Sequence, residues 1–272
     1  MATKVTKNDT LQGLISTTTG NLTLIDHETG VQLYSKTLQD IGIDIKEDNK
    51  KLQGGIGNPT IYAWGENRQI EISLDDATAK LDFTAAKFGQ ELQKGEVKAF
   101  QEAMQYTAKG GKFDLLQEPA KGVKPQMFDM KTGELIPAEN IAIEGKGVTI
   151  TTTVTDGDVY VNGYDITVTD ALYFDIDSDK FAKSFEVIIS NPVVLRQADG
   201  TFKTKYIRQY RFPSGRLEGS MKDDLKSKSD GGKVSSKIEI LKPENSNTMG
   251  RVMLLPLETF GKTQLQAMGF AK

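Results

Sequence analysis

The sequence contains no cysteine and only one histidine, His27, among its 272 residues. The absence of cysteine excludes disulfides, thiolate zinc sites and cysteine nucleophiles. A single histidine gives little support to a histidine metal cluster or a Ser-His-Asp triad. No stretch reaches the ~18 consecutive apolar residues of a membrane-spanning helix, and the polar N-terminus lacks the apolar core of a signal peptide. These absences favour a soluble protein that is not an enzyme, needs no cofactor and has no membrane partner.

Charge is distributed unevenly, although the total is only −3. Residues 201–237 contain ten Lys/Arg and four Asp/Glu, a local net of +6, so the remaining residues total −9. This segment contains Lys203, Lys205, Tyr206, Arg208, Tyr210 and Arg211. Basic residues interleaved with aromatics can bind single-stranded nucleic acid, or they can meet an acidic surface of another copy. The acidic remainder of the chain favours the second interpretation.

Alternating apolar and polar residues predict a mainly β fold, a sandwich or barrel with a flanking α-helix. The predicted hairpins are 21–25 with 31–38, and 60–64 with 68–74, the second turned by Gly65-Glu66-Asn67. From residue 113 onward the pattern is nearly all strand. The apolar run at 185–189 is typical of a buried strand.

An apolar stripe predicts a helical segment over about 75–108. Its members recur every three or four residues: Ala77, Leu81, Ala85, Phe88 and Leu92, continued by Val97, Phe100, Met104 and Ala108. Asp75 or Asp76 can cap the first turn. A helix packed on its own sheet is the preferred interpretation of such a stripe, and a partner surface is the alternative.

One main domain is predicted over residues 21–260, with a candidate sub-domain boundary near 119–125. Residues 1–20 are predicted to be a flexible arm and residues 261–272 a C-terminal tail. The arm and the polar loops at 44–58 and 219–233 are expected to gain order by docking on another chain. Ordinary disorder is the alternative.

The acidic turn after residue 174 is a weak calcium candidate. Asp175, Asp177, Asp179 and Glu186 occupy the spacing of positions 1, 3, 5 and 12 of a calcium loop. The position that normally needs glycine is Lys180 here, and a strand-like segment rather than a helix precedes the turn. An acidic turn between strands is therefore the preferred interpretation.

Several segments resemble the virion structural proteins of tailed phages of Gram-positive hosts. They are 52–65, 68–77, 130–134, 148–155, 157–168 and 205–213. In particular, Tyr210-Arg-Phe-Pro213 before Leu217-Glu-Gly-Ser220 is similar to a strand pair of major tail tube proteins. The resemblance extends over residues 20–255.

This resemblance implies a β-sandwich or barrel that self-assembles. In that family six copies form a ring, and rings stack into a tube whose acidic lumen conducts genomic DNA without binding it specifically. We expect a virion tail protein, assembled in the host cytoplasm, whose partners are itself and other tail proteins. The alternatives are a capsid-associated or decoration protein and a calcium- or carbohydrate-binding β-sandwich.

Overall fold

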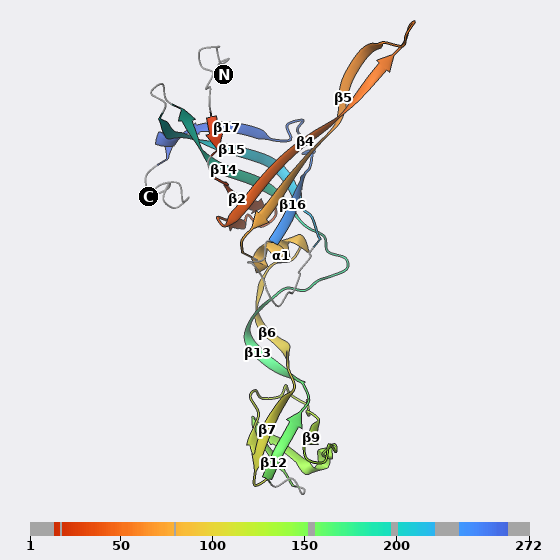
Figure 1. The fold of residues 1–272 in the computed structure, drawn as a ribbon, viewed down its shortest axis with the longest axis vertical. Helices are drawn as coiled ribbons and strands as arrows, with labels where there is room; N and C mark the ends of the chain where they lie inside the picture. Colours follow the sequence, from red (N-terminus) through yellow and green to blue (C-terminus); the bar gives the residue numbers. More distant parts are fainter. Residues whose placement is uncertain are drawn as a thin grey trace. The chain divides into compact units, whose positions relative to one another are not determined.

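The fold is mainly β with one α-helix, as predicted, and it divides into two compact units (Figure 1). A computed structural model describes residues 14–16, 18–78, 80–151, 156–196, 201–220 and 234–260. Unit 1 combines Met1–Glu91 with Asp175–Lys272, and unit 2 is Leu92–Phe174. The predicted boundary near 119–125 falls inside unit 2.

Within the described residues, unit 1 is built on a nine-stranded sheet. Its strands are β1 (Leu14–Ser16), β2 (Asn21–Asp26), β3 (Gln32–Ser35), β4 (Leu38–Gln53), β5 (Thr60–Asp76), β14 (Ser184–Arg196), β15 (Phe202–Leu217), β16 (Val234–Ile240) and β17 (Arg251–Pro256). The order is β3-β2-β14-β15-β16-β5-β4, with β1 also paired to β14 and β17 to β15. A 3₁₀ turn, Leu257–Thr259, follows β17.

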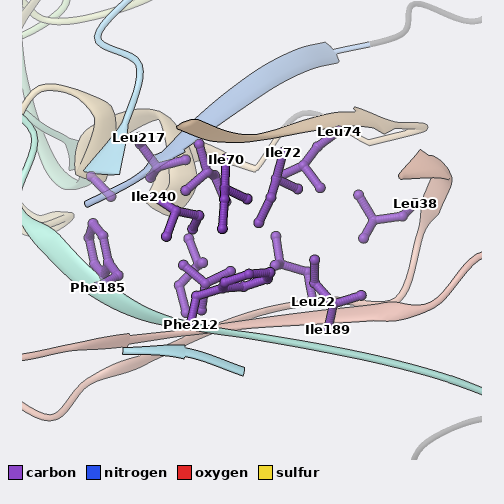
Figure 2. Close-up of a cluster of buried hydrophobic side chains, with 14 residues drawn as sticks. Leu22, Leu38, Ile70, Ile72, Leu74, Phe185, Ile189, Phe212, Leu217 and Ile240 are labelled. Atoms are coloured by element: carbon purple, nitrogen blue, oxygen red, sulfur yellow. The ribbon is translucent and has the colours of Figure 1, made fainter. Parts of the chain in front are cut away.

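The buried face of this sheet encloses one hydrophobic core (Figure 2). Ile70, Ile72 and Leu74 on β5 face Leu22 on β2 and Phe212 on β15 across this core. Side chains alternate between the two faces of a strand, so the residues between these apolar positions lie on the opposite face. Burying each large aliphatic side chain stabilises the fold by about 1.5–3 kcal/mol.

The first predicted hairpin is confirmed, and the second is wrong. β2 pairs with β3 around the Asp26 turn, where Gly30 has a φ of +70°. The second pattern, 60–64 with 68–74, belongs to the single strand β5, which pairs along its length with β4. The Gly65-Glu66-Asn67 turn signal is an irregularity within this pair, because the register shifts between Lys46 and Asp48 and Asn67 has a φ of +51°. The predicted loop at 44–58 is therefore mostly strand.

The predicted helical segment 75–108 shrinks to α1 (Leu81–Lys87), whose Ala86 packs on the core of unit 1. Beyond Gly89 the chain forms strands. Burial in β6 (Gln93–Gln101) alternates residue by residue, a period of two that the helical spacing concealed. β7 (Met104–Lys109) follows.

Unit 2 has a core of its own. Besides β6 and β7 it contains β8 (Lys112–Asp114), β9 (Met127–Asp129), a 3₁₀ turn (Ala138–Asn140), β10 (Ile141–Glu144), β11 (Gly147–Ile150), β12 (Asp156–Val161) and β13 (Tyr164–Tyr173). β6 and β13 form a two-stranded ribbon, and the others a sheet in the order β10-β11-β8-β7-β12-β9. Met127, Val148 and Val159 are fully buried in the core of this unit.

Much of the predicted N-terminal arm and the whole C-terminal tail, 261–272, lie outside the described residues. Within the predicted N-terminal arm, strand β1 is described, and it pairs with β14. Most of the loop at 219–233 also lies outside them.

Candidate interaction surface

Part of the β4–β5 hairpin extends beyond the rest of the sheet (Figure 1). β16 pairs with β5 only over Ile70–Asp76, whereas β4 pairs with β5 as far as Gln53 and Thr60. We call residues 46–69 of this hairpin the arm; the predicted N-terminal arm, residues 1–20, is a different segment. Among the described residues, its two strands pair only with each other. A two-stranded hairpin is marginally stable in water on its own, so the arm has little internal support.

The end of the arm is a glycine-rich turn. Gly55 and Gly57 both have a φ of +85°, and Asn58 has a φ of +50°. Gly54 N–H donates to the Pro59 carbonyl over 3.2 Å, and Asn58 N–H donates to the Gly55 carbonyl over 3.1 Å. Glycine adopts this left-handed geometry without strain, which explains the Gly-Gly-Ile-Gly-Asn-Pro sequence as a turn.

One face of the arm has an apolar stripe of Leu52, Tyr62 and Trp64. The rings of Tyr62 and Trp64 stack with their centroids 5.8 Å apart, and Leu52 lies opposite Tyr62 in the register. The three side chains are 54%, 62% and 41% exposed. At the turn, Ile56 is fully exposed. Isolated exposed apolar residues are common on protein surfaces, whereas these three side chains are contiguous and two of their rings stack.

Polar contacts flank the stripe. Arg68 Nε donates to Glu47 Oε2 over 3.0 Å, and Lys50 lies 3.3 Å from Glu66 across the pair. Asn67 Nδ2 donates to Asp48 Oδ2 over 3.1 Å. Exposed ion pairs of this kind contribute little to stability, with a median of about 0–1 kcal/mol. These three contacts join the two strands of the arm to each other.

A second exposed apolar strand is β17, at the edge of the sheet. Within the described part of the chain it pairs only with β15, which leaves its other edge free. Val252 and Leu254 on this strand are 61% and 37% exposed. β4 and β3 also end the sheet with one unpaired edge each. Exposed apolar edges are templates for pairing with another chain.

The calcium candidates are dispersed among other contacts. Asp175 and Asp179 are exposed, and Asp177 lies 3.0 Å from Lys180. A hydrogen bond from Lys180, with a second from Gln90, lowers the pKa of the Asp177 carboxyl. Glu186 lies on β14 and forms an ion pair with Arg211 on β15. In the described ranges no group of three His, Asp or Glu side chains is placed to hold a metal ion. An acidic turn between strands stays the preferred interpretation, and calcium binding stays the alternative.

The basic segment is partly paired within the chain. A hydrogen bond from Arg211 to Glu186 and the charge of that carboxylate raise the pKa of the Arg211 guanidinium. The pKa of Lys237 is raised in the same way by Glu71, 3.0 Å away on β5. Arg208 donates to the Tyr210 hydroxyl over 3.4 Å, and Lys205 is exposed. Two of the cations of this segment thus already have carboxylate partners on neighbouring strands.

Sequence reasoning missed the arm, because the Gly65-Glu66-Asn67 signal suggested a turn. β5 continues through that signal as one strand, Thr60–Asp76, with a register shift against β4 at this point, and the residue types of such an irregularity are those of a hairpin turn. No helix among the described residues has the length and hydropathy needed to cross a bilayer.

Two comparisons with known proteins bear on identity. No curated protein matches the chain. The family model described as the YomU/Tube protein family matches residues 14–255, which include all of unit 2 and most of unit 1. A tail tube family of this kind is structural, which places the protein in the phage tail. The chain belongs to the YomU/Tube protein family, and its resemblance to phage tail tube proteins is confirmed.

Proposed function

We propose that this protein builds the phage tail tube by self-assembly: six copies form a ring, rings stack, and genomic DNA passes through the lumen. The observation that carries this proposal is the set of unfinished surfaces in unit 1. The arm presents an aromatic stripe to solvent, and the edges of β4 and β17 are unpaired within the described residues. A second copy of the same chain is always available during assembly to cover them.

Ring formation gives these edges partners. An open sheet exposes unpaired N–H and C=O groups along its outer strands, and closure into a continuous wall removes them. β17 is apolar on both faces, with Met253 and Leu255 half-buried and Val252 and Leu254 exposed. Exposed apolar residues on a strand with a free edge are typical of a surface that another chain covers. We infer that the neighbouring copy in a ring provides that surface.

Passage of DNA needs a wall that does not hold phosphates. On the face of β4, β5 and β16 opposite the core, Asp44, Glu71 and Glu239 are neighbours in the register. Two of the cations beside them have carboxylate partners: Lys46 lies 2.9 Å from Asp44, and Lys237 lies 3.0 Å from Glu71. Free cations would bind DNA through counterion release, whereas paired ones on an acidic face do not. This supports conduction without specific binding.

The proposal includes assembly in the host cytoplasm and contact with other tail proteins at the ends of the tube. The first experiment is negative-stain electron microscopy of the purified full chain at increasing concentration. Rings with six-fold symmetry or stacked tubes are the expected result. Separate single particles at every concentration would contradict self-assembly.

A further inference from the structure

Unit 1 contains a groove where β4 lies near β14 and β15. Its volume is about 500 Å³, and its lining includes Asp40, Ile41, Ile43, Ile189, Asn191 and Arg208. Ile189 is buried, and Ile41 and Ile43 are half-buried. The groove therefore has an apolar floor with polar groups at its sides. Its polar groups are of both types, an anionic Asp40 and a cationic Arg208.

One polar atom in this groove lacks a partner. Asn191 Nδ2 donates to Ser16 Oγ over 3.1 Å, but the buried Asn191 Oδ1 accepts no hydrogen bond in the described part of the chain. A buried acceptor without a donor destabilises the folded chain, because it has lost its hydrogen bonds to water. This acceptor has no exposed surface in the isolated chain, so it gains a donor from outside only when docking moves the Asn191 side chain. The indole N–H of tryptophan is a donor without acceptor capacity, and it needs such a partner when it is buried.

The apolar stripe of the arm matches this groove in chemistry. The stripe is a largely exposed surface formed by Leu52, Tyr62 and Trp64, and the Trp64 indole contributes one N–H donor. Beside the stripe, Lys50 and Glu66 form an exposed ion pair. The stripe would pack its apolar area on Ile41 and Ile43 at the floor of the groove, and the Trp64 N–H would donate to Asn191. Lys50 and Glu66 would lie near the charges of opposite sign on Asp40 and Arg208.

The stripe cannot reach the groove of its own copy. Ile43 in the groove and Leu52 in the stripe lie on the same continuous strand, β4, nine positions apart. At about 3.3 Å per residue they are separated by roughly 30 Å along an extended backbone. A stripe that fills such a groove must therefore come from another molecule.

We propose that the apolar stripe of one copy docks in the β4–β14–β15 groove of a second copy. This inference rests on the proposed self-assembly and names two of its contact surfaces. The contact joins two different surfaces, so each copy offers one stripe and one groove. Such head-to-tail contacts propagate into closed rings or open-ended stacks rather than stopping at a dimer.

Because the chain has no cysteine, an introduced cysteine can form a disulfide only with another introduced cysteine. We would place one cysteine beside the stripe, Lys50→Cys, and one in the groove, Asp40→Cys, in separate full-length proteins. Lys51→Cys is the matched control, because Lys51 is also exposed but alternates to the opposite face of the arm. The proteins are mixed under assembly conditions and oxidised, and dimers are counted on a non-reducing gel. Circular dichroism confirms that each variant is folded.

The expected result is a mixed K50C–D40C dimer several-fold more abundant than the K51C–D40C dimer. Trp64 is the single tryptophan, so its emission should also shift to the blue when the unmodified chain assembles. Rings or tubes that form without the K50C–D40C crosslink, or with unshifted emission, would overturn the docking proposal and leave self-assembly standing. A chain that stays monomeric under all conditions overturns both.

Discussion

Gly89 and Phe181 lie so close that Gly89 has no room for a side chain. A Cβ at Gly89 would overlap the main-chain carbonyl of Phe181, and Gly89 has a φ of +68°. The contact fixes the end of α1 against the segment before β14. Next to it, Gln90 Nε2 donates to Asp177 Oδ2 over 2.7 Å. The acidic turn is thus part of the packing of unit 1.

Replacing Gly89 by alanine should therefore destabilise unit 1. The left-handed backbone costs about 1 kcal/mol for a non-glycine residue, and the overlap with rigid backbone adds about 1–3 kcal/mol. The difference in melting temperature between G89A and G30A measures the cost of the overlap with the Phe181 backbone. Gly30 also has a positive φ, +70°, but nothing lies within 4 Å of its Cβ position. Equal melting temperatures for the two variants would contradict the close contact.

Replacing Trp64 by threonine should abolish assembly while the sheet stays folded. Threonine suits a strand, and the core of unit 1 lies elsewhere, on the buried face of the sheet. Central aromatic residues at interfaces often contribute ≥ ~2 kcal/mol, equivalent to roughly a 30-fold loss of affinity. Light scattering measures the assembly. Ala63→Thr, on the opposite face of the same strand, is the control and should still assemble.

Low pH should destabilise the fold by protonating the carboxyl groups of Asp26 and Asp76. Burial would raise the pKa of Asp26 and Asp76, but hydrogen bonds outweigh it and lower both below 3.8. The donors are the Glu28 and Thr29 N–H groups for Asp26, and Ser35, Thr37 and Thr78 for Asp76. A lowered folded-state pKa stabilises the protein above the unfolded pKa, and this contribution is lost as pH falls through the folded-state value.

The melting temperature should therefore fall as the pH drops below about 4, where these carboxyls begin to take up protons in the unfolded chain. Asp76→Asn lowers stability at neutral pH and flattens this acid dependence, since the amide does not titrate. Differential scanning calorimetry of both proteins over this range is the measurement. A pH dependence that is identical in D76N would show that Asp76 contributes nothing to it.

Calcium should leave the melting temperature unchanged. Asp177 is already paired with Lys180, and Glu186 with Arg211 on the adjacent strand. A bound ion at 100 times its Kd stabilises the folded state by about 2.7 kcal/mol, which is easily detected in a melting curve. Melting with excess calcium and with chelator is the comparison. A higher melting temperature with calcium would support the calcium-binding alternative.

The core of unit 1 was predictable where burial alternates on one strand. The β2–β3 hairpin and the buried run at 185–189 follow from apolar residues at every second position or in a short continuous stretch. The helix was predictable only in part. Ala85 and Phe88 belong to the α1 region, but Val97 and Phe100 repeat at helical spacing by coincidence and lie on β6.

The arm and the groove were not predictable, for two physical reasons. Strand irregularities such as that at Asn67 use the same residue types as hairpin turns, so composition does not distinguish them. The groove joins Ile43 to Ile189 and Arg208, far apart in the sequence. Only tertiary structure brings such residues together.

In the proposed assembly, identical copies cover the stripe and the free edges. Sedimentation velocity of the full-length protein over a range of concentrations measures whether they do. We expect a species with the mass of six chains, or larger stacks of it, that grows with concentration and is lost in W64T. A monomer at every concentration would refute self-assembly.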